Sequence, residues 1–126
     1  MPTHFTPCSI PNGCQGDAWY DFDAEAARAL LAEAGYPDGF RLTINGPNDR
    51  FPNDEQILQA VAQMLTRIGI EVRAEAMPFN LILSQGGPPN HAFTAMLLGW
   101  GSNTGEASSP LRALVATVDR DRGLGV

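Results

Sequence analysis

Two alternating segments flank one amphipathic segment between residues 40 and 76, and this order limits the fold more than any other feature. Apolar and polar residues alternate over 40–45 and again over 70–76, which is typical of strands with one buried face. Between them, residues 53–68 carry apolar side chains at helical spacing. Strand, helix and strand joined by short connections predict a right-handed βαβ unit with parallel strands.

Both helices of this part of the chain have marked ends. Asn53 is expected to be the N-cap of the second helix, with Gln56 reaching back in a capping-box arrangement. The first helix is expected over residues 22–34, with Asp21 accepting hydrogen bonds from its first turn and Gly35 ending it in a left-handed conformation. Its apolar residues, Ala26, Ala27, Leu30, Leu31 and Ala34, form a stripe at helical spacing.

Three further elements complete the predicted fold. Residues 78–85 predict a short helix with proline in its first turn, and residues 110–118 predict a final amphipathic helix. The apolar run at 92–98 favours a central strand that is buried on both faces. The fold class is therefore α/β: a small, mostly parallel sheet, made of the βαβ unit plus a further central strand, with flanking helices.

Length and charge exclude several classes of protein. A chain of 126 residues is one domain by size, and its net charge of −6 argues against nucleic acid as a partner, since phosphate binding needs a basic surface. No apolar run approaches the roughly 20 residues that span a bilayer.

The two cysteines leave three alternatives open. Cys8 and Cys14 are separated by five residues, so they can be free thiols or can close a small disulfide loop in an oxidising compartment. A metal site that adds His4 is the weakest of the three, because two thiols and one imidazole fall short of the usual four ligands.

Three ordered segments carry a resemblance to a known family. The first is YDFDAEAARALLAEAGYPDGF, the second covers residues 47–78, and the third is LLGWGSNTGEASSPLRALVAT at 97–117. Together they resemble the extracytoplasmic solute-binding proteins of family 5, which serve peptide, dipeptide and nickel ABC transporters. The resemblance implies part of the C-terminal lobe of a type II periplasmic-binding-protein fold. It divides the chain into an irregular N-terminal segment, 1–19, and a lobe fragment, 20–126.

The resemblance also bears on location. A receptor of this family works outside the cytoplasm, in the periplasm or its equivalent, and reaches it through a secretory signal. The stretch MPTHFTPCSIPNG lacks a basic start and a continuous apolar centre. We therefore expect the sequence to be a fragment or a shortened relative of such a receptor.

The loop at 99–109 is the first candidate for a binding site, because ligands of parallel α/β sheets bind beyond the carboxyl ends of the strands. Trp100 offers a flat apolar face, and Gly101 lets another backbone come close. In the alternative interpretation, Trp100 is a core residue and Glu106 caps a helix or is solvated. The predicted ligand-binding residues are Trp100, Gly101, Ser102, Asn103 and Glu106.

The resemblance adds a role for one of these residues. Peptide receptors of the family often place an acidic residue in this loop, after Gly-Trp, to pair with the amino terminus of the ligand. The corresponding stretch here offers Asn103 and Glu106, and Glu106-Ala107 stands where Asp-Pro is common. Only Glu106 keeps a negative charge, which puts ammonium recognition in doubt.

A second candidate loop spans residues 47–54. Asp49, Arg50 and Asp54 can contact a ligand or the other lobe, or can serve as turn formers and caps, to which Asn, Asp and Pro are suited. No nucleophile, base and orienting group occur in a catalytic arrangement. We therefore expect no enzymatic activity, no catalytic residue, no metal and no cofactor.

The predicted function is that of a partial solute-binding component of an ABC transporter. It binds a peptide or another small solute without catalysis, its membrane partner is the permease, and the lone lobe binds weakly or not at all. The alternative is a stand-alone α/β interaction module that self-associates or docks a protein through its exposed lobe face.

Overall fold

The computed structural model describes residues 8–11, 13, 21–87, 89–101 and 105–116. They fall into two compact units: Asp23–Gly99, and the described parts of Met1–Phe22 together with those of Trp100–Val126. The first unit holds the sheet, and the second holds the last helical segment.

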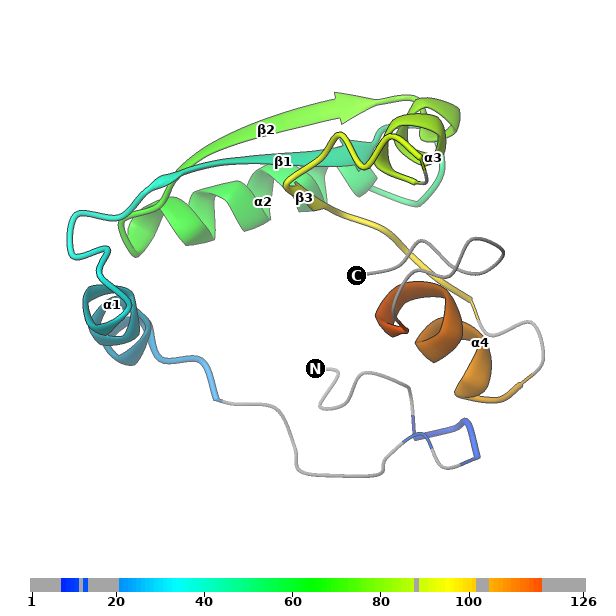
Figure 1. Ribbon diagram of the computed structural model, residues 1–126, viewed down its shortest axis with the longest axis horizontal. Helices are drawn as coiled ribbons and strands as arrows, with labels where there is room; N and C mark the ends of the chain where they lie inside the picture. The colour runs from blue at the N-terminus through cyan, green and yellow to red at the C-terminus, as the bar shows by residue number, and fades with distance from the viewer. Residues whose placement is uncertain (1–7, 12, 14–20, 88, 102–104, 117–126) are drawn as a thin grey trace. The chain divides into compact units, whose positions relative to one another are not determined.

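The sheet confirms the predicted α/β class and the parallel βαβ unit (Figure 1). Strands β1 (Arg41–Pro47) and β2 (Glu71–Met77) pair in parallel without interruption, from Arg41 opposite Glu71 to Pro47 opposite Met77. Helix α2 (Asp54–Arg67) connects the two strands and lies along one face of the sheet. A third strand, β3 (Ala95–Met96), pairs in parallel with the other side of β1, which gives the order β2-β1-β3.

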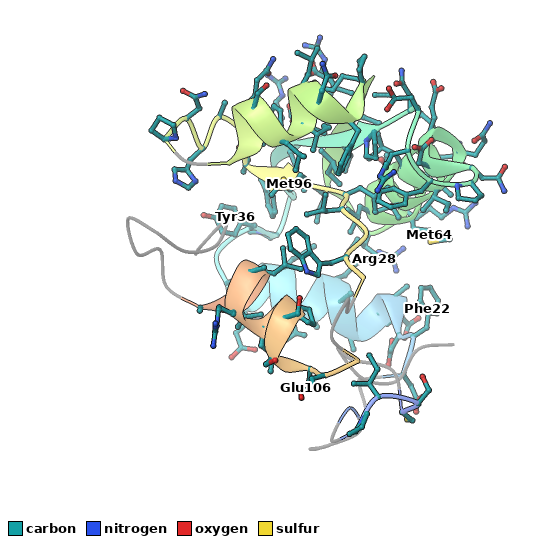
Figure 2. The ribbon with its side chains drawn as sticks, turned by 90° about the vertical axis from the view of Figure 1, so that its right-hand side faces the viewer. Phe22, Arg28, Tyr36, Met64, Met96 and Glu106 are labelled. Atoms are coloured by element: carbon teal, nitrogen blue, oxygen red, sulfur yellow. The ribbon has the colours of Figure 1, made fainter. Side chains whose placement is uncertain are left out.

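The core lies on both faces of β1. On one face, the fully buried Leu58 of α2 packs against Gly46. On the other face lies α3 (Phe79–Gly86), whose Ile82 is also fully buried. Figure 2 labels Met96, whose sulfur approaches Gly86 of α3 so closely that a Cβ at that position would lie 3.0 Å from it. This layering follows from the alternation of side chains along β1.

The predicted position of the third strand is wrong in one respect. Within the described residues β1 is the central strand, whereas β3 lies at an edge and contributes only Ala95 and Met96 to the ladder. Residues 95–98 are half-buried, because β3 has a neighbouring strand on one side only in the described sheet.

Helix α1 (Ala24–Glu33) forms where it was predicted, but its N-cap differs. The side chain of Asp23, two residues after Asp21, accepts hydrogen bonds from the backbone N–H groups of Glu25 and Ala26. The helix buries none of its residues, although they form an apolar stripe, and Leu30 is 64% exposed.

The start of α2 also corrects the sequence prediction. Asn53 occupies the cap position in a left-handed conformation, with φ 57°, and its side chain makes no capping hydrogen bond. The neighbouring Asp54 accepts instead, from the N–H of Glu55 in the first turn and from the N–H groups of Arg50 and Phe51 in the preceding loop. A carboxylate is the stronger acceptor for N–H groups at a helix N-terminus, where the helix dipole favours negative charge.

The second unit contains the predicted final helix in a different form, and residues 117 and 118 of the predicted range lie outside the described residues. A single α-turn, α4 (Ser108–Pro110), continues as a π-helical turn, η1 (Leu111–Val115), before residue 116 adopts an extended conformation. In the same unit Cys8 is disulfide-bonded; the only other cysteine of the sequence, Cys14, lies outside the described residues. No helix in the described parts of the chain is long and apolar enough to cross a membrane.

Candidate functional site

The carboxyl ends of the three strands meet at one edge of the sheet, where parallel α/β proteins bind their ligands. The loop 48–53 follows β1, and Pro78 leads from β2 directly into α3. Residues 97–99 follow β3. Five residues of these connections form what we call the carboxyl-edge cluster: Asp49, Arg50, Phe51, Phe79 and Gly99.

Two hydrogen bonds join the loop after β1 to the connection after β2. The backbone N–H of Asn48 donates to the carbonyl oxygen of Met77 at 3.2 Å and extends the strand pairing by one residue. The Asp49 Oδ1 accepts from the backbone N–H of Phe79 at 2.8 Å, and so satisfies a free donor in the first turn of α3. Asp49 therefore fixes one loop on the start of the next helix.

Aromatic side chains hold the centre of the cluster. The rings of Phe51 and Phe79 pack edge to face with centroids 5.9 Å apart. The Arg50 guanidinium carbon lies 5.9 Å from the Phe51 centroid and 5.4 Å from the Phe79 centroid, within the range of cation–π attraction. Gly99 lies against the Phe51 ring, because an added Cβ would come within 2.9 Å of two ring carbons. All three carboxyl-end connections thus converge on Phe51.

The buried carboxylate of Asp54 shapes the loop behind this cluster. It is 5% exposed, and Oδ2 accepts from the backbone N–H groups of Arg50 and Phe51, each at 3.0 Å. The N–H of Phe51 has the largest effect and lowers the pKa of Asp54; burial acts in the opposite direction, and the N–H groups of Arg50 and Glu55 lower the pKa further. Asp54 therefore fixes the loop conformation that places the side chains of Arg50 and Phe51 in the carboxyl-edge cluster.

Replacing Asp54 by asparagine is expected to lower the Tm by several degrees at neutral pH, because part of the acceptor capacity is lost. The folded state holds the pKa of Asp54 below its ordinary value of 3.8, so the charged carboxylate stabilises the fold above that pH and loses its effect as the pH falls below it. The difference in Tm between wild type and D54N should therefore shrink on acidification, as measured by circular dichroism. Glu55→Gln controls for the loss of a negative charge at this helix end, and equal Tm values of wild type and D54N at neutral pH would contradict the role of Asp54.

The residues predicted to bind ligand lie in the second unit. Trp100 is 42% exposed and Gly101 is exposed, whereas Ser102 and Asn103 lie outside the described residues. The exposed carboxylate of Glu106 accepts from the hydroxyl of Ser108 at 3.3 Å, at the start of α4. This hydrogen bond agrees with the interpretation of Glu106 as a residue of the helix start and leaves its role toward a ligand a prediction.

Sequence reasoning identified the loop 47–54 but missed the aromatic members of the cluster. Phe51 and Phe79 each follow the end of a parallel strand by a few residues, and this shared position is the signal that points to them. Gly99 has no side chain, and the Phe51 ring needs the space that this leaves. Among the described residues, no group of three or more His, Cys, Asp or Glu side chains is arranged to hold a metal.

Comparison with known proteins agrees with this architecture. The sequence model of "Bacterial extracellular solute-binding proteins, family 5 Middle" matches residues 3–121. The chain belongs to this family. The family 5 chain is 33% identical over 118 residues to the glutathione-binding protein GsiB of Salmonella choleraesuis (strain SC-B67), covering 91% of the chain and 23% of that protein. It is 30% identical over 99 residues to the oligopeptide-binding protein AppA of Bacillus subtilis (strain 168), covering 68% of the chain and 18% of that protein.

Solved structures show the same fold. The periplasmic binding protein DppA of Helicobacter pylori, in complex with the peptide STSA, superposes with a TM-score of 0.73 at 25% identity, over 86% of the family 5 chain and 21% of that structure. A dipeptide binding protein of Pseudoalteromonas sp. SM9913, in complex with Met-Leu, gives a TM-score of 0.64 at 27% identity, over 74% of the chain and 19% of that structure. The chain thus spans 23% or less of the length of these relatives.

Proposed function

We propose that this chain is part of the solute-binding component of an ABC transporter and binds a peptide-like solute without catalysis. The observation that carries the proposal is the convergence of three strand-end connections on Phe51, at the sheet edge where such folds bind ligands. Its support from relatives is the family membership, together with neighbours whose structures contain peptides.

We base the proposed partners and location on the same family membership. In an intact receptor of this kind, two lobes close over the solute and the closed form is presented to a membrane permease. We expect the chain to act outside the cytoplasm, because the family is described as extracellular and the DppA neighbour as periplasmic. A disulfide at Cys8 is in keeping with an oxidising compartment.

The proposed ligand contacts begin at the carboxyl-edge cluster. The guanidinium of Arg50 is exposed and lies over two ring faces, so its N–H donors can reach an anionic group of a solute. The contacts predicted from the sequence belong to the other unit and stay a separate prediction. These are Trp100, Gly101, Ser102, Asn103 and Glu106.

Weak binding by the isolated chain is the expected result. A single lobe provides only part of the enclosure, so dissociation constants of about 1 mM or weaker are expected for short peptides. Nuclear magnetic resonance titration of the labelled 126-residue chain with di- and tripeptides and with glutathione tests this. Shift changes at Arg50, Phe51 and Phe79 would support the proposal. A submicromolar dissociation constant would contradict the prediction that the lone lobe binds weakly. The absence of shift changes with every peptide would contradict the proposal that this chain binds peptides.

Arg50→Ala is expected to weaken this response about tenfold, because hydrogen bonds to a charged group are lost. The matched control is Arg41→Ala, which removes an exposed arginine from the opposite end of β1. Circular dichroism of both variants establishes that the fold is retained. Equal peptide responses of wild type and R50A would remove Arg50 from the proposed site.

One observation favours the alternative function, a stand-alone interaction module. Large apolar side chains of the sheet unit are exposed: Leu30 is 64% exposed, Met64 57% and Ile57 46%. Exposed apolar side chains of this kind are typical of surfaces that another protein covers. A stable oligomer that ignores peptides would favour this function, and a chain that responds to peptides, as a monomer or as a dimer, would favour the receptor fragment.

A further inference from the structure

The outer edge of β2 carries backbone groups that point away from the sheet. In the described sheet, β2 pairs with β1 on one side only. The N–H of Glu71 donates to Phe40 and the carbonyl of Met77 accepts from Asn48, so both of these end residues direct their backbone groups toward β1. Since backbone groups alternate sides along a strand, those of Val72, Ala74 and Ala76 point to the open edge.

The charged side chains of β2 are arranged so that an antiparallel copy of the strand would bring opposite charges together. Arg73 and Glu75 lie on the sheet face opposite α2, and the Arg73 side chain is 78% exposed. Within the chain, Arg73 Nε and Glu75 Oε1 are 2.9 Å apart, and Glu75 Oε2 accepts from Asn45 at 3.1 Å. An antiparallel copy centred on Ala74 would place each arginine opposite the glutamate of the other copy.

We infer that the edge of β2 pairs with β2 of a second copy of this chain, antiparallel and with the two-fold axis at Ala74. In this register Ala74 faces Ala74 and Val72 faces Ala76, and these pairs exchange about six backbone hydrogen bonds. Arg73 faces Glu75 in the non-hydrogen-bonded pairs, where side chains come closest and opposite charges stabilise the sheet. The interface is closed, since the same edge is used by both copies.

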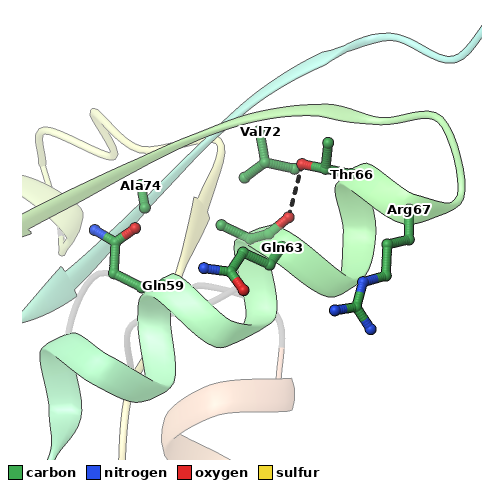
Figure 3. Close-up of a pocket in the computed structure, with 7 residues that line it drawn as sticks. Gln59, Gln63, Thr66, Arg67, Val72 and Ala74 are labelled. Atoms are coloured by element: carbon green, nitrogen blue, oxygen red, sulfur yellow. Dashed lines mark hydrogen bonds between the residues drawn. The ribbon is translucent and has the colours of Figure 1, made fainter.

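The neighbouring face of α2 leaves room for the second copy. A groove of about 340 Å³ runs between α2 and β2. Figure 3 shows Gln59, Gln63 and, near the end of the helix, Arg67 on its helix side, and Val72 and Ala74 on its strand side. A two-fold axis perpendicular to the sheet keeps both α2 helices on one face, with these neutral glutamines near the axis. Glutamine amides both donate and accept, so they can pair across the axis without charge repulsion.

The self-complementary charges favour a second copy over an unrelated strand. Any extended strand could form the backbone hydrogen bonds. Only a strand with a glutamate opposite Arg73 and an arginine opposite Glu75 also matches the charges, and an antiparallel copy of β2 provides both. This interface does not depend on solute binding, because the carboxyl-edge cluster lies at the carboxyl ends of the strands and the pairing uses the outer edge of β2.

The test is a charge swap in the full chain, followed by light scattering and native mass spectrometry over a concentration series. Wild type should form a dimer, and Arg73→Glu should weaken it at least about tenfold by placing like charges opposite each other. The double variant R73E/E75R restores opposite charges and should restore the dimer. Circular dichroism establishes that each variant is folded.

Hydrogen exchange gives a second readout that does not need a variant. The amides of Val72, Ala74 and Ala76 should become protected as the concentration rises, whereas those of Arg73 and Glu75, which point to β1, should not change. A wild-type chain that stays monomeric, or a dimer that R73E leaves unchanged, would overturn the inference. A dimer that R73E weakens and the double variant does not restore would overturn the register.

Discussion

Replacing Gly39 by alanine is expected to lower the free energy of unfolding by about 2 to 5 kcal/mol. Two costs add up: an alanine must adopt a left-handed backbone conformation, and its Cβ clashes with a neighbouring backbone segment. Gly39 lies in the turn before β1 with φ +75°, and an added Cβ would lie only 1.8 Å from the carbonyl oxygen of Gly69. Gly69 occupies the turn between α2 and β2, so the clash is between two backbone segments that enter neighbouring strands. No side chain can move to relieve it. Urea unfolding followed by circular dichroism measures the effect.

Gly35→Ala provides the matched control for the steric part of this effect. Gly35 also has a left-handed backbone, with φ +91°, but an added Cβ would have no other atom within 4 Å. Its replacement should therefore cost only the conformational term of about 1 to 2 kcal/mol. Equal losses in the two variants would show that the close approach of Gly39 to Gly69 does not constrain the fold.

The βαβ unit could be predicted because its signals are local and agree with one another. Alternation over 40–45 and 70–76, with a helical pattern between them, leaves a parallel pair as the simple solution. Gly69 follows the helical pattern directly, and its left-handed φ of +105° is typical of a residue that ends a helix. The pairing β1 with β2 then follows without any long-range information.

Two local details could not be predicted, because neighbouring residues offered the same chemistry. Asp21 and Asp23 are both acceptable caps for α1, and Asn53 and Asp54 are both acceptable at the start of α2. In the structure the Asp23 side chain caps α1, and at the start of α2 the side chain of Asp54, not that of Asn53, accepts from the first turn. The choice depends on where the preceding backbone turns, which side-chain type alone does not determine.

Long-range packing accounts for the remaining differences. The stripe of α1 looks like a core-facing stripe in the sequence, yet the helix buries none of its residues. The run at 92–98 looks like a central strand, yet β3 lies at an edge of the described sheet. An apolar pattern indicates that one face of a helix or strand can be buried, but it does not indicate which segment packs against that face.

The sequence predicted where the candidate site lies in the fold, but not which side chains form it. The strand-end rule located Asp49 and Arg50, because it depends only on where β1 ends. The contact between Phe51 and Phe79 joins residues 28 positions apart, and the space at Gly99 comes from a third strand. These contacts depend on the strand order, which the sequence pattern leaves undetermined.

Replacing Leu58 by alanine is expected to lower the free energy of unfolding by about 2 to 5 kcal/mol, the range for a large core side chain that leaves a cavity. Leu58 is 0% exposed, and both of its terminal carbons lie against Gly46, where an added Cβ would come within 3.1 and 3.2 Å of them. Gly46 has no side chain to fill the space, so the cavity should persist. Urea unfolding measures the loss.

The neighbouring Ile57 gives the control, because it stands on the same helix and is 46% exposed. Ile57→Ala should cost less than about 1 kcal/mol if its surface faces solvent in solution. A similar loss in both variants would mean that Ile57 is covered in solution, by a second copy or another partner. The pair of variants therefore measures the core of the sheet and, separately, the coverage of the outer face of α2.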